Sequence, residues 1–447
     1  MKRIFRFVLI TLLVFSVTLG SLSKTSVSAD DKKTSDWPEG PKVFATTAVL
    51  IDASTGTVLY DKKCHKKMYP ASITKIMTAL LTIENCNLND TVTFSDKAVN
   101  SLNYFEDANI GCQVGEKMKV KDCLYALMLS SANEVATALG EHVGGDVKKF
   151  AEMMNARARE AGANDAHFAN ANGLHDENHY VTAYDMAMIT RAAASHEVFN
   201  EIVNTVTYTI PKNNKRKQIF SSQQRHKMVS PYNAVYYDGI IGGKTGYTDQ
   251  AGTTLVTYAK RKGMTLICVV LHSNGENVYK DTKLLLDYGF DNFEKMDISK
   301  VDSSFSNQKE TLASPFNNQV SSIEADSNAT LIVPKGVKYS DLSRKVTFKQ
   351  EKDSFAQIDY SYLDHTVGSA KLSFKVTKAE TKPAASKQST TESETTTKPS
   401  PKKSFKIPKY MISLLIVLLI LIGILTLLLL QKRKMNRIRA QKRQRNR

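Results

Sequence analysis

The chain has 447 residues, of which 42% are hydrophobic and 23% are charged, and its formal net charge is +17 at pH 7. Most of this excess lies near the two ends: three cations precede residue 7, four lie between 402 and 409, and nine with no anion lie between 431 and 447. Because the rest of the chain is close to neutral, the composition argues against a nucleic-acid partner.

An export signal is predicted at residues 1–29. Three cations are followed by an apolar run from Phe7 to Leu19 and by the small residues Val27-Ser28-Ala29. This order is typical of a secretory signal peptide. A permanent membrane anchor is the alternative interpretation, but the apolar run is short for a hydrocarbon core about 30 Å thick.

Residues 44–296 are predicted to form an α+β domain. Apolar and polar residues alternate from Ala45 to Lys62 around Ser54-Thr55-Gly56, which indicates a hairpin. Helical periodicity dominates from Ala71 to His196. Strands then return at 239–246, 253–260 and 264–272, and a helix follows at 278–288. We therefore expect an antiparallel sheet, built from both ends of this stretch, with flanking helices and a helical subdomain.

The remaining chain is predicted to form four segments. Residues 297–376 show short β patterns and no chemical motif, which favours a β-rich domain with a spacer or docking role. Residues 377–408 lack large apolar side chains and should form a disordered linker. Residues 411–430 carry no charge and are long enough to span a bilayer. The basic tail at 431–447 is expected to stay in the cytoplasm, which predicts a single-pass plasma-membrane protein with an extracytoplasmic domain.

The five cysteines show neither a close pair nor a metal-ligand spacing; they are Cys64, Cys86, Cys112, Cys123 and Cys268. An odd number leaves at least one thiol unpaired in an exported protein. We interpret them as small buried apolar residues, with one disulfide as the alternative. The sequence therefore predicts no metal site.

A Ser-x-x-Lys motif, Ser72 to Lys75, opens an apolar helix directly after Pro70 and Ala71. Residues three apart share a helical face, so the lysine side chain can reach the serine hydroxyl. The lysine can then act as a base that activates the serine as a nucleophile. A lysine acts as a base only when neutral, and we expect burial and the charge of Lys244 to lower its pKa. The same spacing at Ser21, Ser306 and Ser400 has no helical pattern around it.

A second motif, Ser131-Ala132-Asn133, interrupts a helical pattern. Polar residues at such a break can face a cleft, where Ser131 would relay a proton and Asn133 would hold a substrate amide. An ordinary helix N-cap is the alternative interpretation.

A third motif, Lys244-Thr245-Gly246, occurs once and closes an apolar strand. The ammonium and hydroxyl groups can bind a carboxylate, and glycine lets a ligand approach the backbone. A solvated turn is the alternative. The three motifs in this order nevertheless indicate one shared pocket.

These motifs, with the longer stretches 168–176, 179–186 and 242–248, resemble the penicillin-binding D-alanyl-D-alanine carboxypeptidases of the low-molecular-mass serine type. The serine β-lactamases share related motifs. Ala132 replaces the aspartate of the Ser-Asp-Asn version, which fits the carboxypeptidases, and we find no match to the β-lactamase glutamate. The resemblance implies a β-lactamase/D,D-peptidase-like fold.

The resemblance also implies residue roles. Ser72 would form the acyl-enzyme, Lys75 would accept its proton, and Ser131 would pass a proton to the leaving D-alanine. Backbone N–H groups of Ser72 and Tyr247 would form the oxyanion hole. The implied substrate-binding residues are Asn133, Lys244, Thr245, Gly246 and Tyr247. No cofactor is implied.

We therefore expect a serine D,D-carboxypeptidase that cleaves the terminal D-alanine from peptidoglycan stem pentapeptides and is inhibited by β-lactams. The alternatives are a serine β-lactamase and a non-catalytic anchor protein that binds the cell wall. The sequence makes no prediction of the oligomeric state.

Overall fold

The computed structural model describes residues 36–298, 312–313, 319–326, 328–348, 354 and 356–378. The predicted signal peptide, transmembrane segment and basic tail lie outside these residues, as does the predicted linker beyond Lys378. Among the described residues, no helix combines the length and the apolar character needed to cross a membrane.

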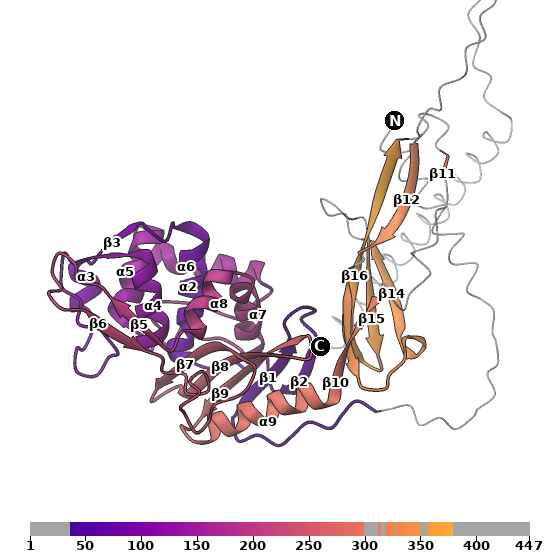
Figure 1. Cartoon of the computed structure of the whole chain (residues 1–447), viewed down its shortest axis with the longest axis horizontal. Coiled ribbons are helices and arrows are strands. Elements are labelled where there is room, and N and C mark those ends of the chain that lie inside the picture. The colour runs from indigo at the N-terminus through magenta and orange to yellow at the C-terminus, as the bar shows by residue number, and fades with distance from the viewer. Residues whose placement is uncertain are drawn as a thin grey trace, which may run out of the picture. The chain divides into compact units, whose positions relative to one another are not determined.

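A five-stranded sheet lies at the centre of the first domain (Figure 1). All its neighbouring strands are antiparallel. The N-terminal hairpin lies beside strands from the far end of the domain, as the sequence predicted. The order across the sheet is β2 (Val58–Lys62), β1 (Thr47–Asp52), β9 (Met264–Ser273), β8 (Gly252–Arg261) and β7 (Ile240–Thr248).

Both faces of this sheet are buried. Successive side chains of a strand point to opposite faces, so Val49 and Ile51 enter the core shared with the helices, whereas Leu50 enters a second core. Helix α9 (Asn277–Asn292) covers the second face (Figure 1). A Cβ atom on Gly289 of α9 would lie 2.5 Å from Leu266 Cδ1, so the glycine allows the helix to pack closely.

The other helices of this domain lie on the opposite side of the sheet from α9. They include η1 (Ala71–Thr74), α2 (Lys75–Asn85), α3 (Asp96–Asn100), α4 (Val120–Tyr125), η2 (Ala126–Ser130), α5 (Asn133–Gly144), α6 (Val147–Glu160), α7 (Ala183–Ala194) and α8 (Glu197–Asn204). Helix α2 is central to this layer, since every residue from Lys75 to Thr82 is buried.

Two small strand pairs add to the predicted layout. Strand β3 (Thr91–Thr93) pairs with β4 (Lys117–Lys119), and β5 (Thr207–Ile210) pairs with β6 (Phe220–Gln223). The first pair interrupts the stretch that we predicted to be mainly helical. Strands of three or four residues are too short for an alternating pattern to stand out.

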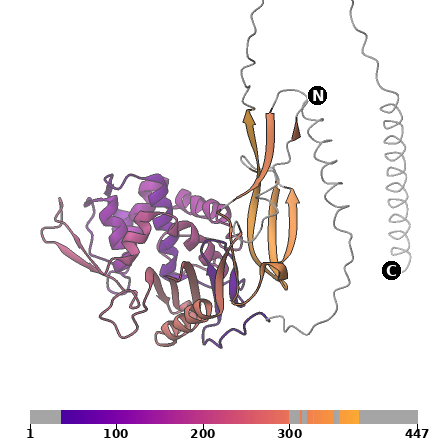
Figure 2. The same cartoon turned by 45° about the vertical axis from the view of Figure 1, so that its right-hand side comes forward.

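The chain then enters a β-rich part (Figure 2). This part has its own apolar core. Strand β10 (Phe293–Asp297) pairs with β13 (Thr330–Pro334), and a short helix, η3 (Tyr339–Asp341), follows. A separate five-stranded sheet has the order β11 (Leu312–Ala313), β12 (Gln319–Ala325), β16 (His365–Lys378), β15 (Ala356–Tyr362) and β14 (Ser343–Phe348). Trp37 stacks on His365 of this part, with ring centroids 3.7 Å apart.

Candidate active site

The turn that carries Ser72 is held from two sides. Ala71, the residue before it, has a φ of 51°, which is uncommon for a residue with a side chain. A Cβ atom on Gly173 would lie 2.0 Å from Ala71 O, and one on Gly246 would lie 2.8 Å from Ser72 N. Both neighbouring segments therefore need glycine, and their close packing fixes the unusual backbone around the serine.

Lys75 starts helix α2, and its side chain is fully buried. Its Nζ lies 2.9 Å from Ser72 Oγ, 2.6 Å from Asn133 Oδ1 and 2.6 Å from the Asn172 carbonyl oxygen. The amide and carbonyl oxygens only accept hydrogen bonds, whereas the serine hydroxyl can also donate. A neutral amine can give its two hydrogens to the two acceptors, which leaves its lone pair facing the Ser72 hydroxyl.

The electrostatic surroundings favour this neutral amine. Burial lowers the pKa of Lys75 well below its ordinary value, and the positive charge of Lys244 lowers it further. Burial and the nearby charge of Arg225 in turn lower the pKa of Lys244 to about 7. Glu134 opposes the shift of the Lys75 pKa, as a negative charge should. The causes are those expected from the sequence, except that Arg225 and Glu134 lie outside the motifs.

The second motif lies at the break between η2 and α5. Ser131 is buried and adopts a left-handed conformation, with φ 63° and ψ 29°. Ala132 is the N-cap of α5, and it makes no side-chain capping bond. The alternative interpretation, in which a polar side chain of this motif caps the helix, is therefore wrong. Asn133 instead turns its side chain to Lys75, while the Ser131 hydroxyl makes no hydrogen bond within the described part of the chain.

The third motif lies on β7, which passes directly beside the serine turn. Lys244 is 1% exposed and donates to the Thr245 carbonyl at 3.0 Å. The solvated-turn interpretation is therefore wrong, because the motif forms part of a strand and its lysine is buried. Thr245 is half-buried, and Tyr247 is exposed with its hydroxyl donating to Asp249 at 2.9 Å.

Only some of the predicted site residues contact one another directly. Ser72, Lys75 and Asn133 are linked by hydrogen bonds, and Gly246 lies against the Ser72 backbone. Among the described residues, the side chains of the other predicted positions make no hydrogen bond to this group; these positions are Ser131, Lys244, Thr245 and Tyr247.

His179 is a buried residue that the sequence analysis did not single out. Its Nδ1 accepts a hydrogen bond from Ala169 N at 3.0 Å, so Nε2 carries the proton and donates to Thr74 Oγ1 at 2.8 Å. Burial lowers the pKa of His179 to about 3, which keeps the ring neutral. These bonds tie the loop that presents the Asn172 carbonyl to the helical turn beside Lys75.

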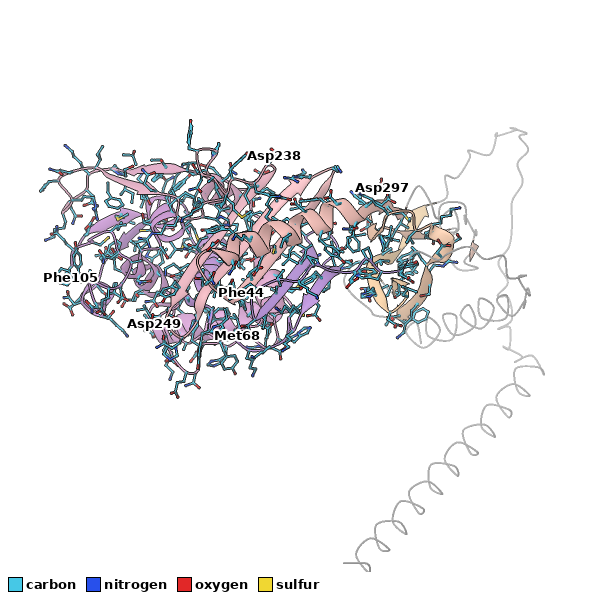
Figure 3. The ribbon with its side chains drawn as sticks, turned by 90° about the horizontal axis from the view of Figure 1, so that it is seen from below. Phe44, Met68, Phe105, Asp238, Asp249 and Asp297 are labelled. Atoms are coloured by element: carbon cyan, nitrogen blue, oxygen red, sulfur yellow. The ribbon has the colours of Figure 1, made fainter. Side chains whose placement is uncertain are left out.

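A loop with an exposed aromatic tip borders the start of α5. The Asn133 N–H donates to Ala108 O at 2.8 Å, and the Ile110 N–H donates to the buried Glu134 carboxylate at 2.7 Å. Phe105 is 94% exposed and projects from the surface (Figure 3). The loop is therefore anchored beside the site and leaves an apolar ring in solvent.

Residues 32–275 match the family described as D-alanyl-D-alanine carboxypeptidase. The chain belongs to this family. The resemblance inferred from the motifs is thereby confirmed, and with it the prediction of a serine-type hydrolase. The chain is 29% identical over 356 residues to D-alanyl-D-alanine carboxypeptidase DacF of Bacillus subtilis, covering 78% of this chain and 86% of the relative. It is 31% identical over 315 residues to DacA of Haemophilus influenzae, covering 67% and 75%.

Solved structures give the same fold. Penicillin binding protein 5 from Haemophilus influenzae matches with a TM-score of 0.61 and 26% identity, covering 76% of this chain and 99% of that one. The Streptomyces K15 DD-transpeptidase matches with a TM-score of 0.52 and 29% identity, covering 57% and 100%. The predicted D,D-peptidase fold of sheet and helices is therefore confirmed.

Proposed function

We propose that the chain is a serine D,D-carboxypeptidase that removes the terminal D-alanine from peptidoglycan stem pentapeptides. The observation that carries this proposal is the buried Lys75 amine, 2.9 Å from Ser72 Oγ and held by two acceptor oxygens. Membership of the D-alanyl-D-alanine carboxypeptidase family supports the substrate class.

Acylation begins when the neutral Lys75 amine takes the proton of Ser72 Oγ. The oxygen attacks the carbonyl carbon of the penultimate D-alanine, and the resulting oxyanion is held by the N–H groups of Ser72 and Tyr247. The bond to the terminal D-alanine nitrogen then breaks. Ser131 relays the proton from Lys75 to that nitrogen, so free D-alanine leaves and an ester on Ser72 remains.

Substrate recognition depends on the groups around this reaction path. Lys244 and Thr245 bind the terminal carboxylate of the substrate, and Asn133 binds an amide of its backbone. Gly246 allows β7 to pass close to the serine turn, because a side chain there would meet the Ser72 backbone. The positive charge of Arg225 adds to the attraction for a carboxylate.

Deacylation returns the enzyme to its starting state. Lys75 removes a proton from a water molecule, which attacks the Ser72 ester. The bond to Ser72 Oγ then breaks, Lys75 returns the proton to that oxygen, and the shortened peptide leaves. A β-lactam acylates the same oxygen by opening its ring. The opened ring keeps its leaving nitrogen tethered, so we propose that the adduct persists and that β-lactams act as inhibitors.

We further propose that the enzyme works outside the plasma membrane. The sequence patterns support export by residues 1–29, a single span at 411–430 and a cytoplasmic tail at 431–447. The β-rich domain at 297–376 and the linker at 377–408 would then set the reach of the site toward the cell wall. An impermeant amine reagent applied to intact cells should label the catalytic domain and spare the tail; labelling of the tail would overturn this orientation.

The decisive test combines penicillin labelling with D-alanine release. Mass spectrometry of the purified protein should locate one penicilloyl group on Ser72, and Ser72→Ala should lose both the adduct and the release of D-alanine from a pentapeptide. Ser101→Ala, in a second Ser-x-Asn sequence, is the matched control. Retention of either activity by Ser72→Ala contradicts the proposal. Rapid hydrolysis of a chromogenic cephalosporin would favour a β-lactamase, and wall binding without an adduct would favour an anchor protein.

A further inference from the structure

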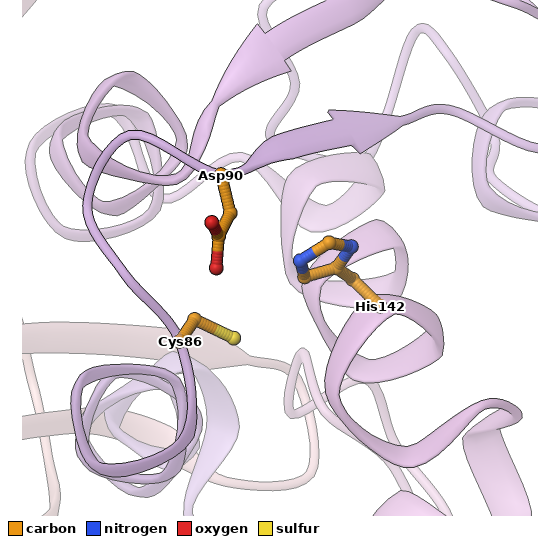
Figure 4. Close-up of side chains that lie close together, drawn as sticks. All are labelled: Cys86, Asp90 and His142. Carbon is orange, nitrogen blue, oxygen red and sulfur yellow. The ribbon is translucent and has the colours of Figure 1, made fainter.

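Three side chains with metal-binding atoms meet far from the serine turn. Cys86 directly follows helix α2, Asp90 lies in the loop that leads to β3, and His142 lies in the last turn of α5. Their sulfur, oxygen and nitrogen atoms all lie within 4.8 Å of one another. Figure 4 shows the cysteine and aspartate on one loop, opposite the histidine on its helix.

This cluster occupies the opposite ends of the two helices that hold the candidate active site. Lys75 begins α2 and Asn133 begins α5, and these two residues are hydrogen-bonded at 2.6 Å. Cys86 and His142 lie at the other ends of the same helices. The helices therefore run side by side in the same direction, and a bond across the cluster would join their C-terminal ends.

The loop from Cys86 to Asp90 is already ordered by backbone hydrogen bonds. The Asp90 N–H donates to Asn87 O at 3.0 Å, and one Asp90 carboxylate oxygen accepts from Asn87 N at 2.8 Å. The Cys86 N–H donates to Thr82 O at 3.0 Å, which fixes the sulfur-bearing residue to the end of α2. Within the described residues, neither the Cys86 thiol nor the His142 ring has a hydrogen-bond or ion-pair partner.

The donor set selects the kind of ion. Thiolate and imidazole ligands suit Zn²⁺, whereas Mg²⁺ and Ca²⁺ prefer oxygen alone. Zinc bonds of about 2.0 to 2.3 Å require tetrahedral ligand atoms to lie roughly 3.3 to 3.7 Å apart. Cys86 is half-buried and His142 is exposed, so modest side-chain rotations can close that difference.

We propose that Cys86, Asp90 and His142 bind Zn²⁺ and that the ion clamps the C-terminal ends of α2 and α5. A water molecule completes the tetrahedron, and the Cys86 thiol releases its proton to the solvent on binding. We predicted no metal site from the sequence, because His142 is far along the chain from the other two ligands. The clamp is structural and takes no part in the peptidase reaction.

The direct test uses Co²⁺ as a spectroscopic probe and Zn²⁺ as a competitor, with the full-length protein after treatment with a chelator. One Co²⁺ per chain should bind and give a thiolate charge-transfer absorption, which Zn²⁺ abolishes. Cys86→Ser should lose the absorption, and His142→Ala should weaken Zn²⁺ binding at least about tenfold. His65→Ala, another exposed histidine, is the control. Absence of the absorption, or equal Zn²⁺ affinity in His142→Ala and the wild type, overturns the proposal.

A second readout tests the clamp itself. Zn²⁺ at about 100 times its dissociation constant should raise the Tm of the wild type on the order of 5 °C and should leave Cys86→Ser unchanged. Penicillin acylation at 25 °C should be equal in both proteins, so failure of the metal proposal is distinguishable from failure of the peptidase proposal. An equal Tm shift in Cys86→Ser would contradict the clamp.

Discussion

The helices α2 and α5 carry a polar cluster at each end, and the two clusters differ in their access to water. At one end Lys75 is fully buried, and burial lowers its pKa, which is why we propose that it acts as the base for Ser72. At the other end Cys86 is half-buried and His142 is exposed. The same pair of helices therefore holds a buried amine at one end and solvent-accessible metal-binding groups at the other.

The largest expected effect comes from replacing the buried base. Lys75→Arg keeps a positive charge and hydrogen-bond donors, but a guanidinium cannot give up its proton in a protein. We expect the rate constant for penicillin acylation to fall by about 10³-fold or more. Lys97→Arg is the control. Acylation by Lys75→Arg within tenfold of the wild type would show that burial of an uncharged amine is not what drives the reaction.

A smaller effect is expected at His179, which positions the loop that carries the Asn172 carbonyl. His179→Phe fills the space but loses the hydrogen bonds of the ring with Thr74, Ala169 and Asn170. The rate of penicillin acylation at saturating penicillin should therefore fall by roughly 10- to 100-fold. His65→Phe, at an exposed site, is the control. An unchanged rate at saturating penicillin would show that His179 has no positioning role in acylation.

The same residue also predicts a pH dependence of stability. The pKa of His179 is about 3 in the folded protein and about 6.5 when unfolded, so the unfolded state binds the proton more tightly. Stability should therefore fall by about 1.4 kcal/mol for each unit as the pH decreases from about 6.5 toward 3. His179→Phe should lack this contribution. Urea unfolding of both proteins between pH 4 and 7 measures the difference in slope.

Arg225 allows a finer test of the buried end. Its positive charge lowers the pKa of both Lys244 and Lys75, so Arg225→Gln should raise both. Because we propose that Lys75 acts when neutral, the rise of penicillin acylation with pH should move to higher pH. Arg159→Gln serves as the control. An unmoved midpoint would show that the Arg225 charge does not reach the pocket.

The smallest effect is expected at the solvated end. His142→Ala removes an exposed ligand at the far end of α5, so acylation at 25 °C should stay within about twofold of the wild type. A larger loss would show that the two ends are coupled in catalysis.

The geometry of a single helix or strand was enough to predict the parts of the site formed by residues close in the sequence. Ser72 and Lys75 meet because residues three apart share a helical face, and Lys244 lies on the predicted strand. The contacts of His179 with Thr74 and of Asn172 with Lys75 join residues far apart in the chain. These contacts depend on how the loops pack, which cannot be predicted from the periodicity of the sequence. The hairpin was predictable from alternation and the main strands were also predicted from the sequence, whereas the short β3–β4 pair was not.

The central claim is that a buried, neutral Lys75 activates Ser72, and the pH dependence of the second-order rate constant for penicillin acylation tests it most directly. Acylation should rise as Lys75 loses its proton, with a midpoint well below the ordinary lysine value of about 10.4. A midpoint at that ordinary value, with the adduct on Ser72, would contradict the account.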